Sequence, residues 1–291
     1  MSRGATLRWP RPRAAIAAYR KITPDLGPAL IFVVPVVLPA GLPRSIQSAR
    51  VVAIVPSRYG STRLPGKALA LIDGKPMIQH VHARAASASR VDAVLVATDD
   101  ERIANAVDAF GGTAVMTSTL HPTGTDRLAE VAAALSGDII INVQGDEPLI
   151  DAAAIDACVQ SLTDHPADVM STVRRPLADD EDSNPAVVKV VVDQNDVALY
   201  FSRSPLPHVR WGNVAPARWA HLGLYGYRRT FLLTLAALAP TPLEQAESLE
   251  QLRVLEHGFR IRCVATVSAS IGVDTAEDLE RVRGLFATLK Q

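Results

Sequence analysis

The sequence has only two cysteines in 291 residues, and its formal net charge is zero. Cys158 and Cys263 lie far apart in apolar stretches, so their spacing supports neither a disulfide framework nor a zinc site. We expect two buried thiols in a protein of the reducing cytoplasm. The balanced charge gives no support to a nucleic-acid-binding protein. With 48% hydrophobic residues, the chain has ample material for a packed core.

The sequence also lacks an uninterrupted apolar segment that could cross a membrane. A basic stretch, 3–21, precedes an uncharged one, 26–43, in an order that superficially resembles a signal peptide. Prolines interrupt the uncharged stretch, and each would remove a hydrogen bond from a spanning helix. We interpret residues 1–49 as a poorly ordered extension, with a membrane tether as the alternative, and expect no stable membrane association. Residues 50–291 are expected to form a single domain.

From Val51 onward, apolar runs alternate with segments of helical periodicity. Runs at 51–55, 93–97, 113–116 and 139–143 predict strands, and their nearly continuous apolar character is typical of buried parallel strands. Apolar spacing and capping signals predict the intervening helices, at 76–87, 101–110, 125–135 and 151–162. This order predicts an α/β fold with an open, mostly parallel, Rossmann-like sheet.

The second half of the chain changes character. Two strand-like runs, 187–192 and 197–201, flank a polar turn at 193–196, which predicts a β-hairpin. We expect this hairpin to project from the sheet as a dimer arm, and the protein to be a homodimer. The remaining predicted elements are strands at 221–227 and 261–266 and helices at 249–256 and 275–289.

Two common nucleotide-binding fingerprints are absent. There is no G-x-G-x-x-G motif, and the loop "RYGSTRLPGK" (58–67) lacks the spacing of a Walker loop. That loop nevertheless places Arg58, Arg63 and Lys67 directly after the strand at 51–55. Its glycines allow backbone N–H groups to turn toward anionic oxygens, and its cations supply neutralising charge. The loop predicts a site for a strongly anionic ligand, with a solvated basic loop as the alternative.

Carboxylates follow other predicted strands, where ligands bind in doubly wound sheets. Asp146 comes after the strand at 139–143, and Asp274 after an apolar run at 271–273 that we expect to be a strand. Two carboxylates beside a phosphate site would repel the ligand unless a divalent ion lay between them, which indicates Mg²⁺. Helix-capping aspartates without a metal are the alternative.

Other polar residues are less informative. "TDDERI" (98–103) is better explained as a helix N-terminus capped by Asp99 or Asp100 than as part of a metal site. The histidines that we considered show no metal-ligand spacing, so we expect structural or surface roles for them; they are His80, His82, His121 and His165.

Taken in order, the motifs resemble those of the 3-deoxy-manno-octulosonate (Kdo) cytidylyltransferases. The resemblance runs from about Val51 to the C-terminus. Its motifs are "PSRYGSTRLPGKAL", "GKPMIQHV", "VATDDERI", "GTDRLAEV", "NVQGDEP", "NPAVVKVV", "YFSRSPLP", "HLGLYGYR", "ESLEQLRVLEHG" and "GVDTAEDLERVR". The first motif alone indicates only a sugar nucleotidyltransferase, whereas "SRSPLP", "HLGLYGYR" and "ESLEQLR" are typical of the acid-sugar half of this family.

The resemblance implies transfer of CMP from CTP to the anomeric hydroxyl of 3-deoxy-D-manno-octulosonate, with Mg²⁺ and release of pyrophosphate, for lipopolysaccharide biosynthesis. It implies that Arg63 and Lys67 neutralise the triphosphate and that Asp146 and Asp274 hold Mg²⁺. Further implied nucleotide contacts are Arg58, Gly60, Ser61 and Gln144, and the implied sugar contacts are Arg203, His221, Tyr225, Glu250 and Gln251.

Three rival functions use similar parts. A cytidylyltransferase for a sialic-acid-like sugar or a uridylyltransferase would carry the same loop, but the acid-sugar motifs argue against both. A metal-dependent glycosyltransferase needs D-x-D at a strand end, and "GDE" (145–147) does not provide it. A nucleotide-sensing protein without turnover would be expected to lack Lys67 or Asp146, and both are present.

Overall fold

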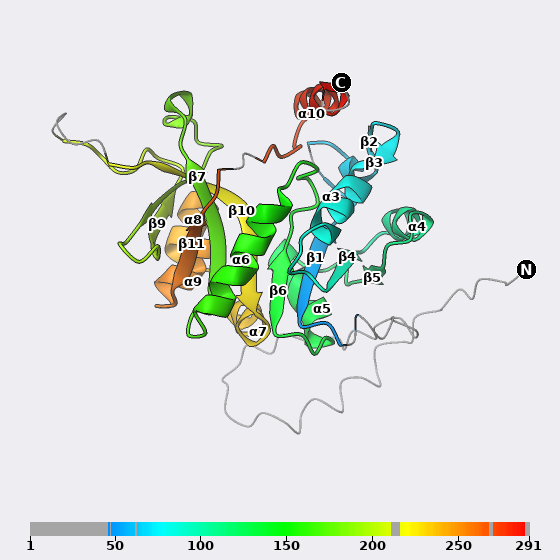
Figure 1. Cartoon of the computed structure of the whole chain (residues 1–291), viewed down its shortest axis with the longest axis horizontal. Coiled ribbons are helices and arrows are strands. Elements are labelled where there is room, and N and C mark those ends of the chain that lie inside the picture. The colour runs from blue at the N-terminus through cyan, green and yellow to red at the C-terminus, as the bar shows by residue number, and fades with distance from the viewer. Residues whose placement is uncertain (1–45, 47, 62, 211–215, 268–269, 289–291) are drawn as a thin grey trace, which may run out of the picture.

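The chain folds around one large mixed sheet (Figure 1). The computed structural model describes residues 46, 48–61, 63–210, 216–267 and 270–288. The strand order is β11-β7-β10-β6-β1-β4-β5, and β8 pairs with both β10 and β9. The strands are β1 Val51–Ser57, β4 Ala93–Thr98, β5 Ala114–Met116, β6 Ile139–Asn142, β7 Met170–Pro176, β8 Lys189–Val192, β9 Ala198–Ser202, β10 Trp219–Arg228 and β11 Ile261–Ala265.

The expected open α/β sheet is confirmed. Strand β1 is parallel to both β4 and β6, and β4 is parallel to β5, so the carboxyl ends of these strands lie at one edge. Strand β10 runs antiparallel between β6 and β7 and joins this parallel half to the rest of the sheet. The β1 residues 52–55 have no exposed surface, as their unbroken apolar sequence predicts.

Helices cover both faces of the sheet. One core contains apolar side chains of α5 and α7, and the other contains those of α3, α4 and α6. The helices are α3 Met77–Ala86, α4 Glu101–Ala109, α5 Gly124–Ala133, α6 Ala152–Asp164, α7 Arg229–Ala237, α8 Pro242–Glu247, α9 Gln251–Glu256 and α10 Ala276–Thr288. Asp100 caps α4 by accepting a hydrogen bond from the Arg102 N–H, so this part of the "TDDERI" interpretation is confirmed.

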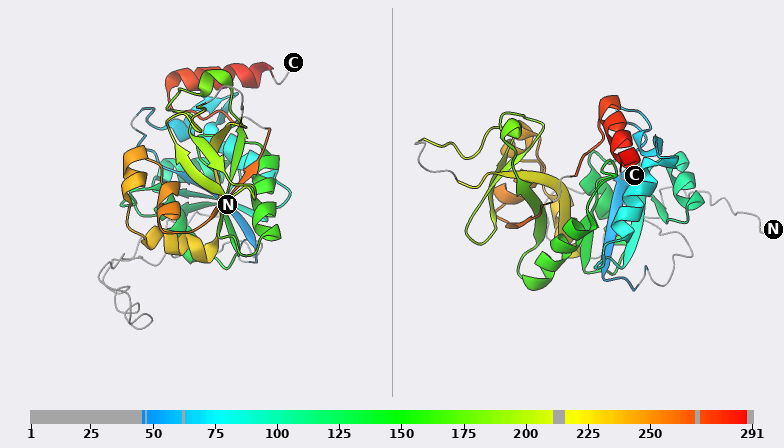
Figure 2. Two further views of the ribbon diagram at one scale, coloured as in Figure 1. Left: turned by 90° about the vertical axis from the view of Figure 1, so that its left-hand side faces the viewer. Right: turned by 45° about the horizontal axis from the view of Figure 1, so that its top comes forward.

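A third, smaller core lies beside the sheet. The C-terminal helix α10 packs there against the short ribbon of β2 (Leu71–Ile72) and β3 (Lys75–Pro76), at the top of Figure 1. Its buried members are Ile72, Met77, Val273, Leu279 and Val282. Both views in Figure 2 show α10 on the outside of the molecule. This core therefore fixes the segment that precedes α10 against the first half of the chain.

The predicted hairpin forms from β8 and β9, which pair antiparallel. Its turn is bonded to the sheet, because the Cys263 N–H donates to the Asp196 carbonyl and Arg262 Nη1 to the Asn195 carbonyl. The segments that extend furthest from the sheet in Figure 1 are instead those that follow β7 and β9. Its role as a dimer arm stays a prediction.

Several elements differ from the sequence predictions. Strand β7 and helices α7 and α8 were not predicted. The run 271–273 was predicted as a strand and is not one. The Val273 N–H instead donates a hydrogen bond to the Asp146 carbonyl. Most of the expected extension, 1–49, and position 289 of the last predicted helix lie outside the described residues. Ile46 and Ala49 are buried in the core.

Candidate active site

The loop after β1 folds back on itself. The Tyr59 carbonyl accepts hydrogen bonds from the backbone N–H groups of Ser61 (2.9 Å) and Gly66 (3.0 Å). Gly66 has a φ of +69°, a left-handed conformation that favours glycine, and a Cβ there would also lie 3.1 Å from the Tyr59 ring. The turn ends in a single 3₁₀ turn, Lys67–Leu69, so the loop places Lys67 over the carboxyl end of the sheet.

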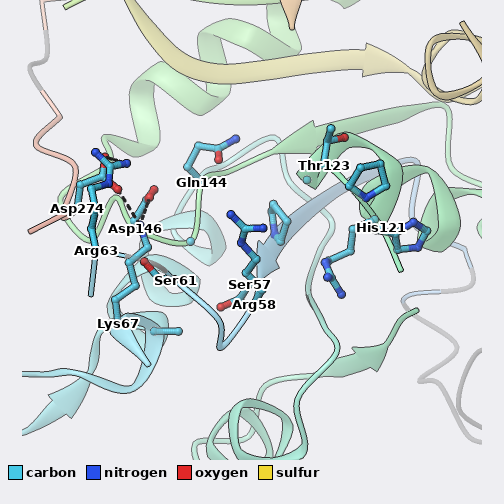
Figure 3. Close-up of a pocket in the computed structure, with 16 residues that line it drawn as sticks. Ser57, Arg58, Ser61, Arg63, Lys67, His121, Thr123, Gln144, Asp146 and Asp274 are labelled. Atoms are coloured by element: carbon cyan, nitrogen blue, oxygen red, sulfur yellow. Dashed lines mark hydrogen bonds and ion pairs between the residues drawn. The ribbon is translucent and has the colours of Figure 1, made fainter. Parts of the chain in front are cut away.

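Lys67 binds both of the predicted metal ligands. Its Nζ donates to Asp146 Oδ2 (2.6 Å), to Asp274 Oδ1 (3.0 Å) and to the Val273 carbonyl (3.3 Å). Burial alone would lower the pKa of the Lys67 ammonium, but the two carboxylates outweigh burial and raise it. Arg63 pairs with the other Asp274 oxygen at 2.9 Å. Arg63, Lys67 and the two aspartates thus form one cluster, and Arg58 lies apart from it (Figure 3).

Asp274 reaches this cluster from the far end of the chain. It precedes α10, where Asp278 Oδ2 accepts hydrogen bonds from the Asp274 and Thr275 N–H groups. The Val273 N–H donates to the Asp146 carbonyl at 2.8 Å, so the two aspartates lie on adjacent backbone segments. The aspartates are therefore held in register by the third core and by this backbone bond.

The cluster lines one side of a cavity of about 350 Å³. In Figure 3, Lys67, Arg63 and the two aspartates lie on one side of it, and His121 and Thr123 lie on the other. Of the residues predicted to contact the nucleotide, Arg58, Ser61 and Gln144 also line this cavity, whereas Gly60 does not. A Cβ on Gly60 would meet nothing within 4 Å. The size and the polar lining suit a charged ligand.

The opposite side of the cavity was not predicted. It is formed by the N-terminus of α5, where Thr123 and Asp126 form a capping box. Arg127, on the same helix, is buried, pairs with Asp99 (2.7 Å) and lines the cavity. His121 also lines it and binds Glu130. Asp126, Arg127 and Glu130 belong to the motif "GTDRLAEV", which contributed to the family resemblance but did not by itself predict a cavity wall.

The predicted sugar contacts fall into two groups. His221 is buried, which lowers its pKa to about 3, and its Nε2 is 2.9 Å from Thr172 Oγ1. Its ring lies 5.4 Å from that of Tyr225, whose hydroxyl donates to Gln251 Oε1 at 3.3 Å. Burial raises the pKa of Tyr225, and the nearby Glu250 charge adds to the shift.

Glu250 connects this group to the cavity. Its Oε2 accepts a hydrogen bond from Thr125 Oγ1 (2.5 Å) in the first turn of α5. Burial raises the pKa of the Glu250 carboxyl. Four of the five predicted sugar contacts are thus contiguous with the helix that forms the cavity wall.

Arg203 lies apart from this group. Its guanidinium donates to backbone carbonyls of Pro185 (2.9 Å), Glu247 (2.8 Å) and Ser248 (3.4 Å). These bonds connect β9 to the segment before β8 and to the end of α8. A guanidinium carries five N–H donors, so Arg203 retains donors for a ligand carboxylate.

Glu147, directly after Asp146, was also missed. Its Oε2 is buried and has no hydrogen-bond partner among the described residues. Burial raises the pKa of its carboxyl to about 7 against the opposing effect of the nearby Ser270 hydroxyl, and the charge of Asp146 adds to the rise. In the sequence, the "GDE" triplet indicated only that the D-x-D motif of glycosyltransferases is absent, and it gave no role to Glu147.

The two aspartates fit a hard divalent cation. Carboxylate oxygens from both already converge on one cationic atom, Lys67 Nζ, and oxygen donors are what Mg²⁺ prefers. Among the described residues, no group of three or more His, Cys, Asp or Glu side chains is arranged to hold a metal. The remaining ligands of such an ion would therefore be phosphate oxygens and water.

No helix in the described part of the chain is both long and apolar enough to cross a membrane.

Solved structures share the fold. One described as CMP:2-keto-3-deoxy-manno-octonic acid synthetase complexed with CTP superposes with a TM-score of 0.80 at 47% identity, covering 82% of this chain and 99% of that chain. A putative glucose-1-phosphate thymidylyltransferase from Bacillus anthracis superposes with a TM-score of 0.56 at 16% identity, covering 81% of this chain and 94% of its own. This second likeness concerns the fold alone.

Sequence comparisons agree with the motifs. The family model described as "Cytidylyltransferase" matches residues 52–261. A 3-deoxy-manno-octulosonate cytidylyltransferase from Geobacter metallireducens is 56% identical over 244 residues, 80% of this chain and 96% of the relative. One from Myxococcus xanthus is 54% identical over 243 residues, 83% of this chain and 98% of the relative. The family expected from the motifs is confirmed: the chain belongs to the 3-deoxy-manno-octulosonate cytidylyltransferases.

Proposed function

We propose that this protein transfers CMP from CTP to the anomeric hydroxyl of 3-deoxy-D-manno-octulosonate, releasing pyrophosphate. The product, CMP-Kdo, is the activated sugar for lipopolysaccharide biosynthesis. The observation that carries this proposal is the cluster of Arg63, Lys67, Asp146 and Asp274 at one cavity, in a chain whose relatives carry this enzyme's name.

The cations of the loop act on the triphosphate. The sugar hydroxyl attacks the α-phosphorus in line, and negative charge grows on the leaving pyrophosphate. Lys67 and Arg63 lie at the cavity wall where they neutralise this charge, and such electrostatic stabilisation is the main contribution that a protein makes to phosphoryl transfer. Arg58, Gly60, Ser61 and Gln144 bind and orient the nucleotide.

Asp146 and Asp274 are the residues that would hold Mg²⁺. The bound ion supplies charge neutralisation at the phosphates and lowers the pKa of a coordinated hydroxyl. The proposal is supported by the convergence of both carboxylates on Lys67 Nζ. An ion held there would compete with Lys67 for the carboxylates, which would leave the Lys67 ammonium available to the phosphates of CTP.

The second half of the chain binds the acid sugar. Arg203 pairs with its carboxylate, for which a forked guanidinium is well suited. His221, Tyr225, Glu250 and Gln251 bond to its hydroxyl groups. The support is their contiguity with the cavity wall through the Glu250–Thr125 hydrogen bond.

We further propose a cytoplasmic homodimer in which residues 50–291 form one domain. Exposed apolar side chains on β9 and α8 support an interface there, since Leu199 is 62% exposed and Leu243 40%. Sedimentation analysis of the wild type and of a Leu199→Asp, Leu243→Asp double variant tests this. A wild type that sediments as a monomer would contradict the proposal.

Pyrophosphate release is the direct test of the activity. We expect release with CTP, Mg²⁺ and 3-deoxy-D-manno-octulosonate, and little with other nucleotides or with a sialic acid. A preference for a sialic acid would identify a related cytidylyltransferase. Nucleotide binding without turnover on any acid sugar would indicate a nucleotide-sensing protein.

A further inference from the structure

Strand β10 contains a bulge next to the cavity. Its register against β7 shifts between Leu222 and Tyr225, and Thr172 Oγ1 donates to the Leu224 carbonyl at 2.7 Å inside the bulge. Bulges are common beside active sites, where they change the direction of a side chain. The residue that the bulge presents at this place is a glycine, Gly223.

Packing does not require glycine at position 223. A Cβ there would lie 3.7 Å from Gln144 Cγ and 3.8 Å from Glu147 Oε1, which are ordinary van der Waals distances. The other glycine of β10, Gly226, is different, because its Cβ would lie 2.7 Å from Ser171 Oγ. A methyl group on residue 223 would therefore fit the protein, and it would lie over Gln144 and Glu147.

Two buried polar atoms, one of them on the glutamate under Gly223, lack a geometric hydrogen-bond partner in the protein. Glu147 Oε2 and Gln251 Nε2 have no partner within hydrogen-bonding geometry among the described residues, although the Ser270 hydroxyl is close enough to Glu147 to lower the pKa of its carboxyl. Gln251 is only 4% exposed. Both residues are close to Tyr225: its hydroxyl donates to Gln251, and the Glu147 charge contributes to its raised pKa. Leaving such atoms unpaired is costly, so a ligand that bonds to them is expected.

The side chain of Glu147 indicates which of the two substrates binds beside it. Gln144, which lies under Gly223, also lines the cavity, so this position borders the proposed nucleotide site. The phosphates of CTP offer acceptor oxygens and no hydrogen-bond donor to the Glu147 carboxylate, whereas a sugar hydroxyl can donate to it. The amide N–H of Gln251 in turn donates to a hydroxyl oxygen. A polyhydroxylated ligand therefore matches both unpaired atoms.

We infer that Glu147 accepts a hydrogen bond from a hydroxyl group of the acid sugar, and that Gly223 leaves open the space which this part of the sugar occupies. The inference rests on the proposed function and adds a specificity-determining pair to it.

Two variants test the pair by different means. Glu147→Gln keeps the shape of the side chain and weakens the acceptor, and Gly223→Ala adds one methyl group without a close contact. We expect each to raise the KM for 3-deoxy-D-manno-octulosonate roughly 10- to 100-fold, the range for losing a hydrogen bond to a charged group. The Kd for CTP, titrated without sugar, should change less than about twofold.

Matched controls separate ligand binding from folding. Glu256→Gln, at the end of α9, alters a carboxylate that accepts hydrogen bonds from the backbone of α8 and should leave the sugar KM unchanged. Gly226→Ala should lower the melting temperature, because its methyl group would collide with Ser171. Gly223→Ala should melt close to the wild type. Should Glu147→Gln fail to fold, Gly223→Ala alone still tests the inference.

The outcomes are distinct. The inference is overturned if Gly223→Ala has the KM of the wild type for the sugar. It is also overturned if Glu147→Gln raises the Kd for CTP and leaves the KM for the sugar unchanged. Neither result contradicts the proposed function. A wild-type enzyme that releases no pyrophosphate from CTP with this sugar overturns the proposed function, and the inference with it.

Discussion

Replacing Lys67 with methionine tests the metal site without relying on turnover. The Lys67 ammonium lies 2.6 Å and 3.0 Å from oxygens of Asp146 and Asp274, so it occupies the place where those carboxylates converge. Methionine keeps a similar apolar chain and removes the charge. Without that competing cation, the nucleotide-free protein should bind Mg²⁺ more tightly than the wild type.

The size of the effect follows from distance and exposure. Two unit charges 4 Å apart interact by about 4 kcal/mol at an effective dielectric constant of 20. Asp146 is 28% exposed and Asp274 43%, so solvent screens part of this interaction. We therefore expect Lys67 to oppose Mg²⁺ binding by about 1–2 kcal/mol, because solvent-exposed ion pairs are much weaker than unscreened ones. This corresponds to Mg²⁺ binding about 5- to 30-fold more tightly.

Isothermal titration of MgCl₂ into nucleotide-free protein measures this affinity. Turnover should fall in the same variant, by roughly 10²-fold or more, since the leaving pyrophosphate loses its cation. Arg63→Met is the matched control: Arg63 is 65% exposed and pairs with Asp274, so the gain in Mg²⁺ affinity should be smaller. Unchanged or weaker Mg²⁺ binding in folded Lys67→Met protein would refute the assignment of this carboxylate pair as a metal site.

Three other predictions concern single side chains. Asp146→Asn and Asp274→Asn should fold normally and lose roughly 10²-fold or more in kcat; near wild-type kcat at saturating Mg²⁺ would exclude the residue as a ligand. Arg203→Ala should raise the sugar KM roughly 10- to 100-fold with CTP affinity unchanged, whereas a lower melting temperature with intact KM would mean that Arg203 only braces β9. Because the pKa of His221 falls from 6.5 unfolded to about 3 folded, the unfolded state takes up its proton first as the pH drops. This group should therefore lower the free energy of unfolding by roughly 1.4 kcal/mol between pH 7.5 and 5.5. In denaturant titrations at the two pH values, His221→Gln should lose that much less stability than the wild type. An equal loss in both proteins would contradict the prediction.

The residues of the charged cluster could be predicted because local sequence places them. Arg63 and Lys67 follow a buried strand within a glycine-containing loop, and Asp146 follows another strand of the same parallel half. The carboxyl ends of such strands meet at one edge, so proximity follows from topology alone. Asp274 lies in the cluster as expected, but the element before it was predicted wrongly, because 271–273 does not form a strand.

Strand β7 could not be predicted from its residues. It reads Met-Ser-Thr-Val-Arg-Arg-Pro, which lacks an apolar run, yet it lies between β10 and β11. Its buried polar side chains bond to distant partners: Thr172 bonds to His221, and Arg174 bonds to Asp196 and to the Cys263 carbonyl. The positions of Glu147 and Arg127 at the site could not be predicted either, because they depend on contacts with residues that are distant in sequence.

The position of Asp274 has a consequence for how the enzyme is made. Lys67 and Asp274 are separated by 207 residues, and Asp274 is held by a helix that ends close to the C-terminus. During synthesis the N-terminal parts of a chain are available to fold first. The sheet and the loop at 58–67 can therefore assemble before Asp274 is available to pair with Arg63 and Lys67. On the proposed function, a chain synthesised only as far as β11 would hold the loop and Asp146 but not the second carboxylate, so activity would follow the docking of the segment that carries Asp274.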